Sequence, residues 1–126
     1  MDKFIEVIGR ILLGLIFVMA GFSKIGAAYA GTAAYMDSMG VPGALLPLVI
    51  ILEIAGGLMV IAGFKVSWAA YALAAFTLIA GIIFHADFAD QMQSILFMKN
   101  LAITGGLLLL AIHGAGELSL DKKLAR

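Results

Sequence analysis

The chain of 126 residues contains no cysteine. Disulfide exchange, thiolate catalysis and iron–sulfur ligation all require that residue, so this chain carries none of the three by itself. Charge is sparse and balanced as well, with eight basic and eight acidic residues. A protein that binds nucleic acid usually shows a basic excess or a basic patch, and neither is present here. The sequence therefore excludes thiol chemistry and predicts no nucleic-acid partner.

Apolar residues are abundant, at 63% of the chain, and the mean hydropathy is +1.12. Four windows are long enough to cross a hydrocarbon core of roughly 30 Å, which takes about 20 apolar residues. In lipid only helices and closed barrels satisfy their backbone polar groups, and these windows lack the alternation of strands. The sequence predicts an all-α integral membrane protein, one domain over residues 1–126, with up-and-down helices at 4–22, 44–64, 67–86 and 95–113.

The basic residues predict the orientation of these helices, because cytoplasmic segments carry an excess of lysine and arginine. The side with both chain ends holds Lys3, Arg10, Lys65, Lys122, Lys123 and Arg126. The opposite side holds Lys24 and Lys99, so we expect both termini in the cytoplasm and the lipid bilayer around the helices. The "AYA" at 28–30 resembles a signal-peptide cleavage site, but Asp2 and Glu6 before the first apolar run favour a retained helix.

The longest connection, residues 23–43, predicts a short helix in the membrane interface. Thr32 is suited to cap its start, and Tyr35, Met36 and Met39 share one of its faces. Gly40, which a proline follows two residues later, is expected to end it. We expect about one to two turns of helix.

The first predicted span carries a stripe with a cation at each end. Arg10, Gly14, Phe17, Gly21 and Lys24 recur at spacings of four and three residues, so they share one side of the helix. We expect Arg10 and Lys24 to extend toward opposite head-group layers. Small residues admit neighbouring helices in membranes. The glycines expected in this packing role are Gly14, Gly21, Gly56, Gly57 and Gly106.

Glu53 lies inside the second span, roughly 13 Å from the outer end of that span at 1.5 Å per residue. A charge near the midplane costs about 3 kcal/mol on insertion scales, so such residues usually face the bundle interior and find a partner. Lys99 and Lys24 are both within reach, and the choice between them stays open. The role of the pair stays open too, since a buried ion pair can fix helix register without any ligand.

All four spans contribute a polar residue to the outer half, and a cluster of this kind predicts a ligand-binding site. Its members are Lys24, Glu53, His85, Lys99 and Asn100. His85 is followed closely by Asp87 and Asp90. We expect no metal on these residues and Glu53, because one histidine with scattered carboxylates does not match the usual ligand sets. His113 lies at the opposite membrane face, which excludes a haem held by two histidines.

The polar residues stand in segments with a distinctive order: "RILLGLIFVMAGFSK" at 10–24, "GTAAYMDSMGVP" at 31–42, "LEIAGGLMVIAGF" at 52–64, "FHADF" at 84–88 and "FMKNLAITGGLLLLAIHGAG" at 97–116. These segments resemble the DoxX family of small bacterial membrane proteins. The resemblance implies a four-helix protein of the inner membrane, and members of the family have been linked to quinone and thiol-stress systems. His113 departs from the family's pattern, so we expect no general role for it.

Two functions of different classes stay open, and with them the question of whether the chain is an enzyme. The first is a membrane redox or detoxification component that binds a quinone or similar apolar oxidant. Lys24 or Lys99 would donate to a carbonyl oxygen, and Glu53 would orient the lysine or relay a proton. No cofactor is expected to be covalently bound, so electrons would reside on the quinone or on a redox partner subunit.

The second function is a non-enzymatic membrane partner that assembles or anchors a larger complex. A small transporter ranks below both, because four unbroken helices offer little for alternating access unless the chain forms a homo-oligomer.

Overall fold

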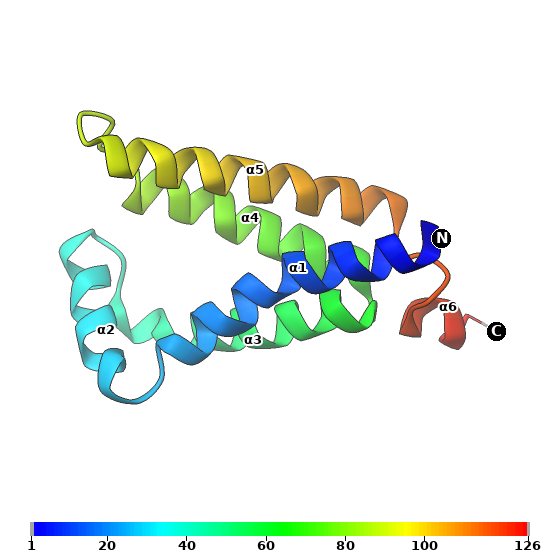
Figure 1. Cartoon of the computed structure of the whole chain (residues 1–126). Coiled ribbons are helices and arrows are strands. Elements are labelled where there is room, and N and C mark those ends of the chain that lie inside the picture. The colour runs from blue at the N-terminus through cyan, green and yellow to red at the C-terminus, as the bar shows by residue number, and fades with distance from the viewer. Residues whose placement is uncertain (1, 126) are drawn as a thin grey trace.

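The computed structural model describes residues 2–125, and within that range it contains helices and no strand. Figure 1 shows their arrangement. The α-helices are α1 (Asp2–Ser23), α2 (Tyr29–Ser38), α3 (Leu46–Ala62), α4 (Val66–Phe84), α5 (Gln91–His113) and α6 (Leu120–Leu124). Two short 3₁₀ turns, η1 (Gly26–Ala28) and η2 (Gly43–Leu45), precede α2 and α3.

Four helical segments are long and apolar enough to cross a membrane: Asp2–Ser23, Gly43–Ala62, Val66–Phe84 and Gln91–His113. Large apolar side chains stay exposed on all four, as expected of surfaces that face lipid. The predicted all-α membrane fold is confirmed. The short helix predicted in the first long connection is confirmed as α2, which is longer than the expected one to two turns.

The four long helices form two pairs, α1 with α3 and α4 with α5, which meet where α3 packs on α4. Figure 1 shows the pairs close together at the end that carries both termini and further apart at the end that carries α2. The buried apolar core occupies the terminal half. Its members include Phe17 of α1, Val60 of α3, Leu73 of α4, and Leu107 and Ala111 of α5. The half toward α2 has no such shared core among the described residues.

Glycines set how closely α1 and α3 approach. A Cβ added to Gly14 would lie 2.6 Å from the carbonyl oxygen of Gly57, and one added to Gly57 would lie 2.8 Å from that of Gly14. Gly21, seven residues after Gly14, faces Ile54 and Glu53 with comparable closeness. Gly56 instead faces Leu73 of α4. The space beside these glycines is therefore filled by neighbouring helices, whereas Gly106 faces Leu13 at 3.9 Å, an ordinary contact.

Arg10 joins three segments at the terminal end. The residue is only 3% exposed, and its guanidinium donates to the carbonyl oxygens of Ile61, at 3.1 Å, and Leu118. Gly63, at φ 72°, ends α3 and leaves room for this guanidinium, which a Cβ would strike. The expectation that Arg10 extends to lipid head groups is wrong, because the two carbonyl oxygens hold it inside the protein.

The C-terminal segment is fastened to the same place by Asp121. Its carboxylate accepts from the backbone N–H groups of Lys65, at 2.6 Å, and Val66, at 2.9 Å, which are free donors at the start of α4. Its own N–H donates to the carbonyl oxygen of Gly63 at 2.9 Å. These bonds hold Lys65 in a left-handed conformation, at φ 44°, and dock α6 beneath the turn between α3 and α4.

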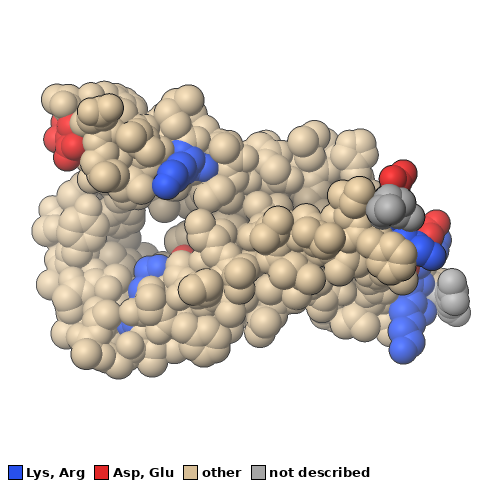
Figure 2. Space-filling model, in the orientation of Figure 1, with Lys and Arg blue, Asp and Glu red and all other residues tan. Residues whose placement is uncertain are grey.

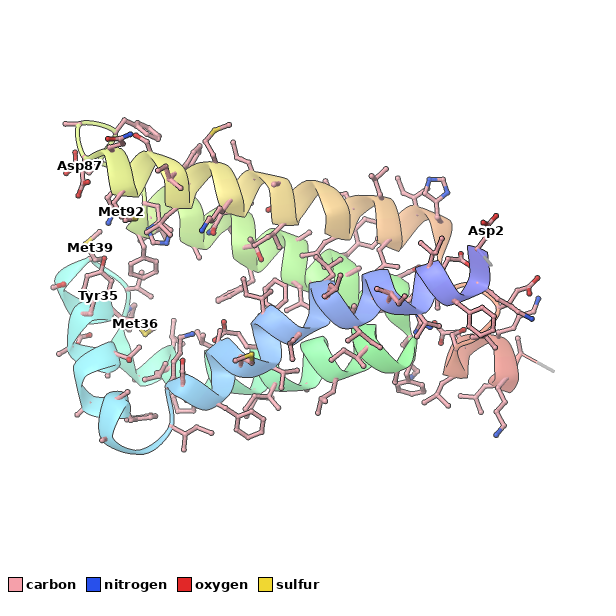
Figure 3. All side chains as sticks on the ribbon, viewed as in Figure 1. Asp2, Tyr35, Met36, Met39, Asp87 and Met92 are labelled. Atoms are coloured by element: carbon pink, nitrogen blue, oxygen red, sulfur yellow. The ribbon has the colours of Figure 1, made fainter. Side chains whose placement is uncertain are left out.

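The position of Thr32 differs from the sequence prediction. It lies inside α2 and its hydroxyl donates back to the carbonyl oxygen of Ala28, so it is not the cap. Helical geometry continues from η1 directly into α2, which removes the need for a side-chain cap. Met36 is buried, and the ring of Tyr35 stacks on Phe84 of α4 with centroids 5.5 Å apart. Figure 3 shows Tyr35, Met36 and Met39 on the side of α2 toward α4 and α5.

The glycine crossing of α1 and α3 yields a matched pair of variants. Gly57→Ala should destabilise the protein by about 1–3 kcal/mol, because its methyl group meets the Gly14 backbone. Gly105→Ala adds the same group where nothing lies within 4 Å, and should be neutral or stabilising by up to about 1 kcal/mol. Thermal unfolding in detergent measures both. Equal melting of the two variants would contradict this crossing.

The Arg10 contacts predict a local effect on the C-terminal segment. Arg10→Met leaves two carbonyl oxygens unpaired, at about 1–3 kcal/mol for each buried group. Amide exchange at Asp121 should quicken, because its bond to Gly63 depends on the docked tail. Lys99→Met, exposed on α5 in the half toward α2, is the control and should leave exchange unchanged. Unaltered exchange in Arg10→Met would show that the tail is held by other contacts.

Candidate functional site

An opening separates the two helix pairs in the half toward α2. Figure 2 shows it as a hollow through the molecule, with basic side-chain atoms on both sides and acidic atoms at its edge. The shared apolar core ends before this half, while α2 closes the far end through the contact of Tyr35 with Phe84. The opening is therefore bounded by α1 and α3 on one side, α4 and α5 on the other, and α2 at the end.

On the side of α1 and α3, Lys24 and Glu53 form an ion pair. Lys24 Nζ donates to Glu53 Oε1 at 2.7 Å and to the carbonyl oxygen of Ala20 at 3.2 Å. Gly21 is the reason that the pair forms, since it brings the α1 backbone next to Glu53 one turn before Lys24. The structure thus selects Lys24, and not Lys99, from the two partners that the sequence left open.

The two members of this pair differ in exposure. The Glu53 side chain is 5% exposed and that of Lys24 is 25% exposed. Glu53 Oε1 is used by Lys24, whereas Oε2 accepts no hydrogen bond from any residue in the described range 2–125. Lys24 has three N–H donors and uses two of them. One acceptor and one donor of the pair therefore remain for a further group.

Lys99 lies on the α5 face that looks toward α1. Lys99, Ile103, Gly106 and Leu110 recur at spacings of four, three and four residues, which places them on one stripe. Gly106 and Leu110 line a groove with Leu13 of α1, so the stripe faces that helix. Lys99 continues the stripe into the open half, is exposed, and pairs with no carboxylate in the part of the chain that the structure describes.

Asn100 is used within its own helix pair. Its Nδ2 donates to the carbonyl oxygen of Thr77 at 3.1 Å, and its side chain rests on Gly81, where a Cβ would lie 3.1 Å away. Thr104 is buried and its hydroxyl donates to the carbonyl oxygen of Asn100 at 2.7 Å. Thr77 and Gly81 were not identified from the sequence. An apolar helix with an isolated small residue gives no signal of which partner residue rests on it.

His85 lies apart from the ion pair, at the end of α4, where its Nδ1 is 3.0 Å from Gln93 Oε1. Asp90 accepts from the N–H of Met92 and so caps α5, and Asp87 is exposed in the same loop. Among residues 2–125, no three His, Cys, Asp or Glu side chains gather as metal ligands. His113 lies at the other end of α5, exposed and in the last turn.

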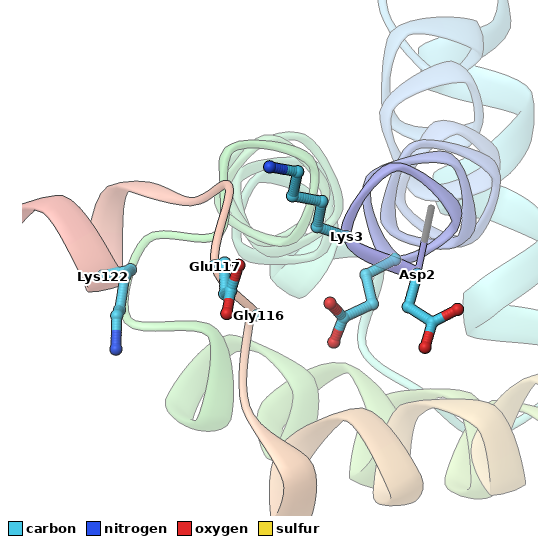
Figure 4. Close-up of a pocket in the computed structure, with 6 residues that line it drawn as sticks. Asp2, Lys3, Gly116, Glu117 and Lys122 are labelled. Atoms are coloured by element: carbon cyan, nitrogen blue, oxygen red, sulfur yellow. The ribbon is translucent and has the colours of Figure 1, made fainter.

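Two other hollows lie at the terminal end. A wide surface hollow of about 780 Å³ is bounded by α1, the segment before α6, and α6; Figure 4 shows its lining. Its lining residues are Asp2, Lys3, Glu6, Gly116, Glu117 and Lys122. A groove of about 310 Å³ runs between α1 and α5. Neither contains a residue of the predicted site, so the predicted site and these hollows are separate.

The model of the DoxX family matches residues 5–86, more than half of the chain. The chain belongs to the DoxX family. The match contains Lys24, Glu53 and His85 of the candidate site and ends before Lys99 and Asn100. The family match therefore does not bear on Lys99, and its place in the candidate site follows from the geometry of α5 in this DoxX protein.

Two curated relatives resemble this DoxX chain over most of its length. It is 50% identical over 117 residues to inner membrane protein YqjF of Escherichia coli (strain K12), covering 93% of this chain and 89% of that protein. It is 35% identical over 123 residues to inner membrane protein YphA of the same organism, covering 92% and 87%. No solved structure matches the chain. Four apolar helices and these relatives make it a DoxX protein of the inner membrane.

The ion pair predicts non-additive stability. Lys24→Met leaves the carboxylate of Glu53 buried without its partner, and Glu53→Leu leaves the lysine without its carboxylate, so each single change should destabilise. The double variant should recover part of that loss. We expect a coupling energy of about 0.5–3 kcal/mol, below that of a fully buried pair because Lys24 is 25% exposed. Unfolding of the four proteins in one detergent measures it; additive losses would contradict the pairing.

Proposed function

We propose that this DoxX protein is a component of a membrane redox or stress-detoxification system and binds a quinone, or a similar apolar oxidant, in the opening between the helix pairs. The observation that supports this most is that the Lys24–Glu53 pair joins α1 to α3 while Lys99 belongs to α5, so these polar groups stand on the two helix pairs that the hollow in Figure 2 separates. Binding sites for small molecules are typically apolar with a few well-placed polar groups. A ring with carbonyl oxygens fits that description.

The polar residues around the opening bind and orient the ligand. The third N–H of Lys24 donates to a carbonyl oxygen of the ligand, and Lys99 donates from the other side of the opening. Glu53 holds the Lys24 ammonium in place through its 2.7 Å bond. The rings of Tyr35 and Phe84 bound the opening at its α2 end. Polar groups at membrane depth are costly unless satisfied, so a ligand that uses these free groups lowers that cost.

The chain itself supplies no site for electrons. It has no cysteine, and its two histidines lie at opposite ends of the long helices. Electrons in the proposed reaction therefore stay on the bound ligand or pass to a partner subunit. The lateral opening suits a ligand that dissolves in the bilayer, since such a ligand reaches the space from between the lipids.

Protection against heating by a quinone tests the proposal. Menadione, a quinone without a tail, should raise the melting temperature of the detergent-solubilised protein. At a concentration of one hundred times its Kd, a ligand adds about 2.7 kcal/mol to the free energy of unfolding. Lys99→Met should weaken menadione binding roughly tenfold, the loss of one charge-assisted hydrogen bond. The Lys99 side chain makes no hydrogen bond or ion pair within residues 2–125, so the fold should survive its replacement. Lys123→Met, on the exposed α6, is the matched control and should bind like the parent.

The remaining outcomes separate the alternatives. Melting that is unchanged by menadione and by longer-chain quinones would overturn the proposal. If a stable protein partner co-purifies in mild detergent in that case, the assembly function replaces it. Solute flux in proteoliposomes, together with an oligomer in detergent, would instead favour the transporter.

A further inference from the structure

We infer that the opening selects ligands that carry a hydroxyl group, such as phenols and the hydroquinone form of a quinone, over rings that only accept hydrogen bonds. This inference rests on the proposed binding of a ring ligand in the opening and names the chemical class that the site prefers.

The free oxygen of Glu53 is an acceptor that a ligand hydroxyl group can use. Oε1 is bonded to Lys24, while Oε2 has no donor among residues 2–125, although the side chain is 95% buried by its 5% exposure. Two polar side-chain atoms of residues 2–125 are both fully buried and without a hydrogen-bond partner, Arg10 Nε and Thr77 Oγ1. Oε2 has no partner either but is not among the fully buried atoms. The little surface that Glu53 exposes therefore includes this oxygen. A ligand O–H can donate to it, whereas a quinone carbonyl has no hydrogen to donate and gains no bond from this oxygen.

The remaining N–H donor of Lys24 allows the same hydroxyl group to make a second hydrogen bond. A hydroxyl oxygen both donates and accepts, so one hydroxyl group can donate to Glu53 Oε2 and accept the third N–H of Lys24. A carbonyl oxygen can use only the lysine. Hydrogen bonds to charged groups are the stronger ones, and the extra bond should make the hydroxyl ligand bind about tenfold to a hundredfold tighter.

Lys99 can donate a hydrogen bond to a second oxygen of the ligand. It stands on the face of α5 toward α1, so it offers a donor from the other wall of the opening. A hydroquinone has a second oxygen on the opposite side of its ring, and this oxygen can accept from Lys99. A phenol with one oxygen lacks that contact. The order of affinity should therefore be hydroquinone first, then phenol, then a ring of the same shape without a hydroxyl group.

A pair of ligands in which a methyl group replaces the hydroxyl hydrogen, so that the donor is lost and the accepting oxygen is kept, tests the inference without redox chemistry. We would titrate the protein with 2-naphthol and with 2-methoxynaphthalene by calorimetry, and repeat both with Glu53→Gln and with Lys123→Met. The parent and the Lys123→Met control should favour 2-naphthol at least tenfold. In Glu53→Gln the preference should fall several-fold, because the acceptor is no longer charged. The deciding quantity is the change in this preference from one protein to the next, because the partition of each ligand into the detergent is the same for every protein and cancels in that change.

The variant Lys24→Met/Glu53→Leu guards against a misfolded protein. It removes both members of the pair, leaves no buried charge, and should bind the two naphthalenes equally while melting cooperatively. Equal binding of the two naphthalenes by the parent, with menadione still bound, would overturn this inference and leave the proposed function intact. Binding of neither naphthalenes nor quinones would overturn both. A 2-naphthol preference that persists in the double variant would place the hydroxyl contact elsewhere and contradict the role of Glu53.

Discussion

A carboxylate in the middle of a membrane helix stays charged at low cost only where a cation meets it, and the arrangement of α1 and α3 follows from how Glu53 meets this constraint. Its partner, Lys24, lies 29 residues earlier in the chain and on another helix. The pair forms because Gly14, Gly21 and Gly57 let α1 and α3 approach until backbone meets backbone. Close approach between membrane helices is driven by packing of small residues and not by hydrophobic burial. The glycines and the ion pair thus make α1 and α3 one unit.

The two ends of the protein are built on different principles. At the terminal end, apolar side chains from four helices share a core. Arg10 closes it by donating to carbonyl oxygens of α3 and of the C-terminal segment, and Asp121 by accepting from the first N–H groups of α4. At the α2 end the helix pairs separate, and α2 touches α4 through one stacked ring pair. A packed terminal end and separated helix pairs at the α2 end suit a site that a ligand enters from the bilayer. Function in this protein is therefore expected where the core ends.

Much of the fold follows from the sequence, because length and apolar content determine which segments can cross a membrane. The four long helices are predicted in this way, and the short one after α1 is predicted from its shared face and the glycine that ends it. The sequence pattern does not determine which lysine pairs with Glu53. Depth along a helix allows Lys24 and Lys99 equally, and the choice depends on how each helix is rotated about its axis. Gly21 was recognised as a packing residue, yet nothing in the stripe indicates that it faces Glu53.

The bonds of Arg10 and Asn100 lay beyond sequence analysis for a related reason. Both side chains bond to backbone carbonyl oxygens, and every residue has one, so no residue type marks the partner. Whether the polar set binds a ligand stays a prediction. An experimental structure in lipid with 2-naphthol or a hydroquinone tests it most directly. We predict ligand density between the helix pairs, within hydrogen-bond distance of Glu53 and Lys24. Helix pairs closed on each other, with Lys99 bonded to Glu53 and no space between, would contradict the account.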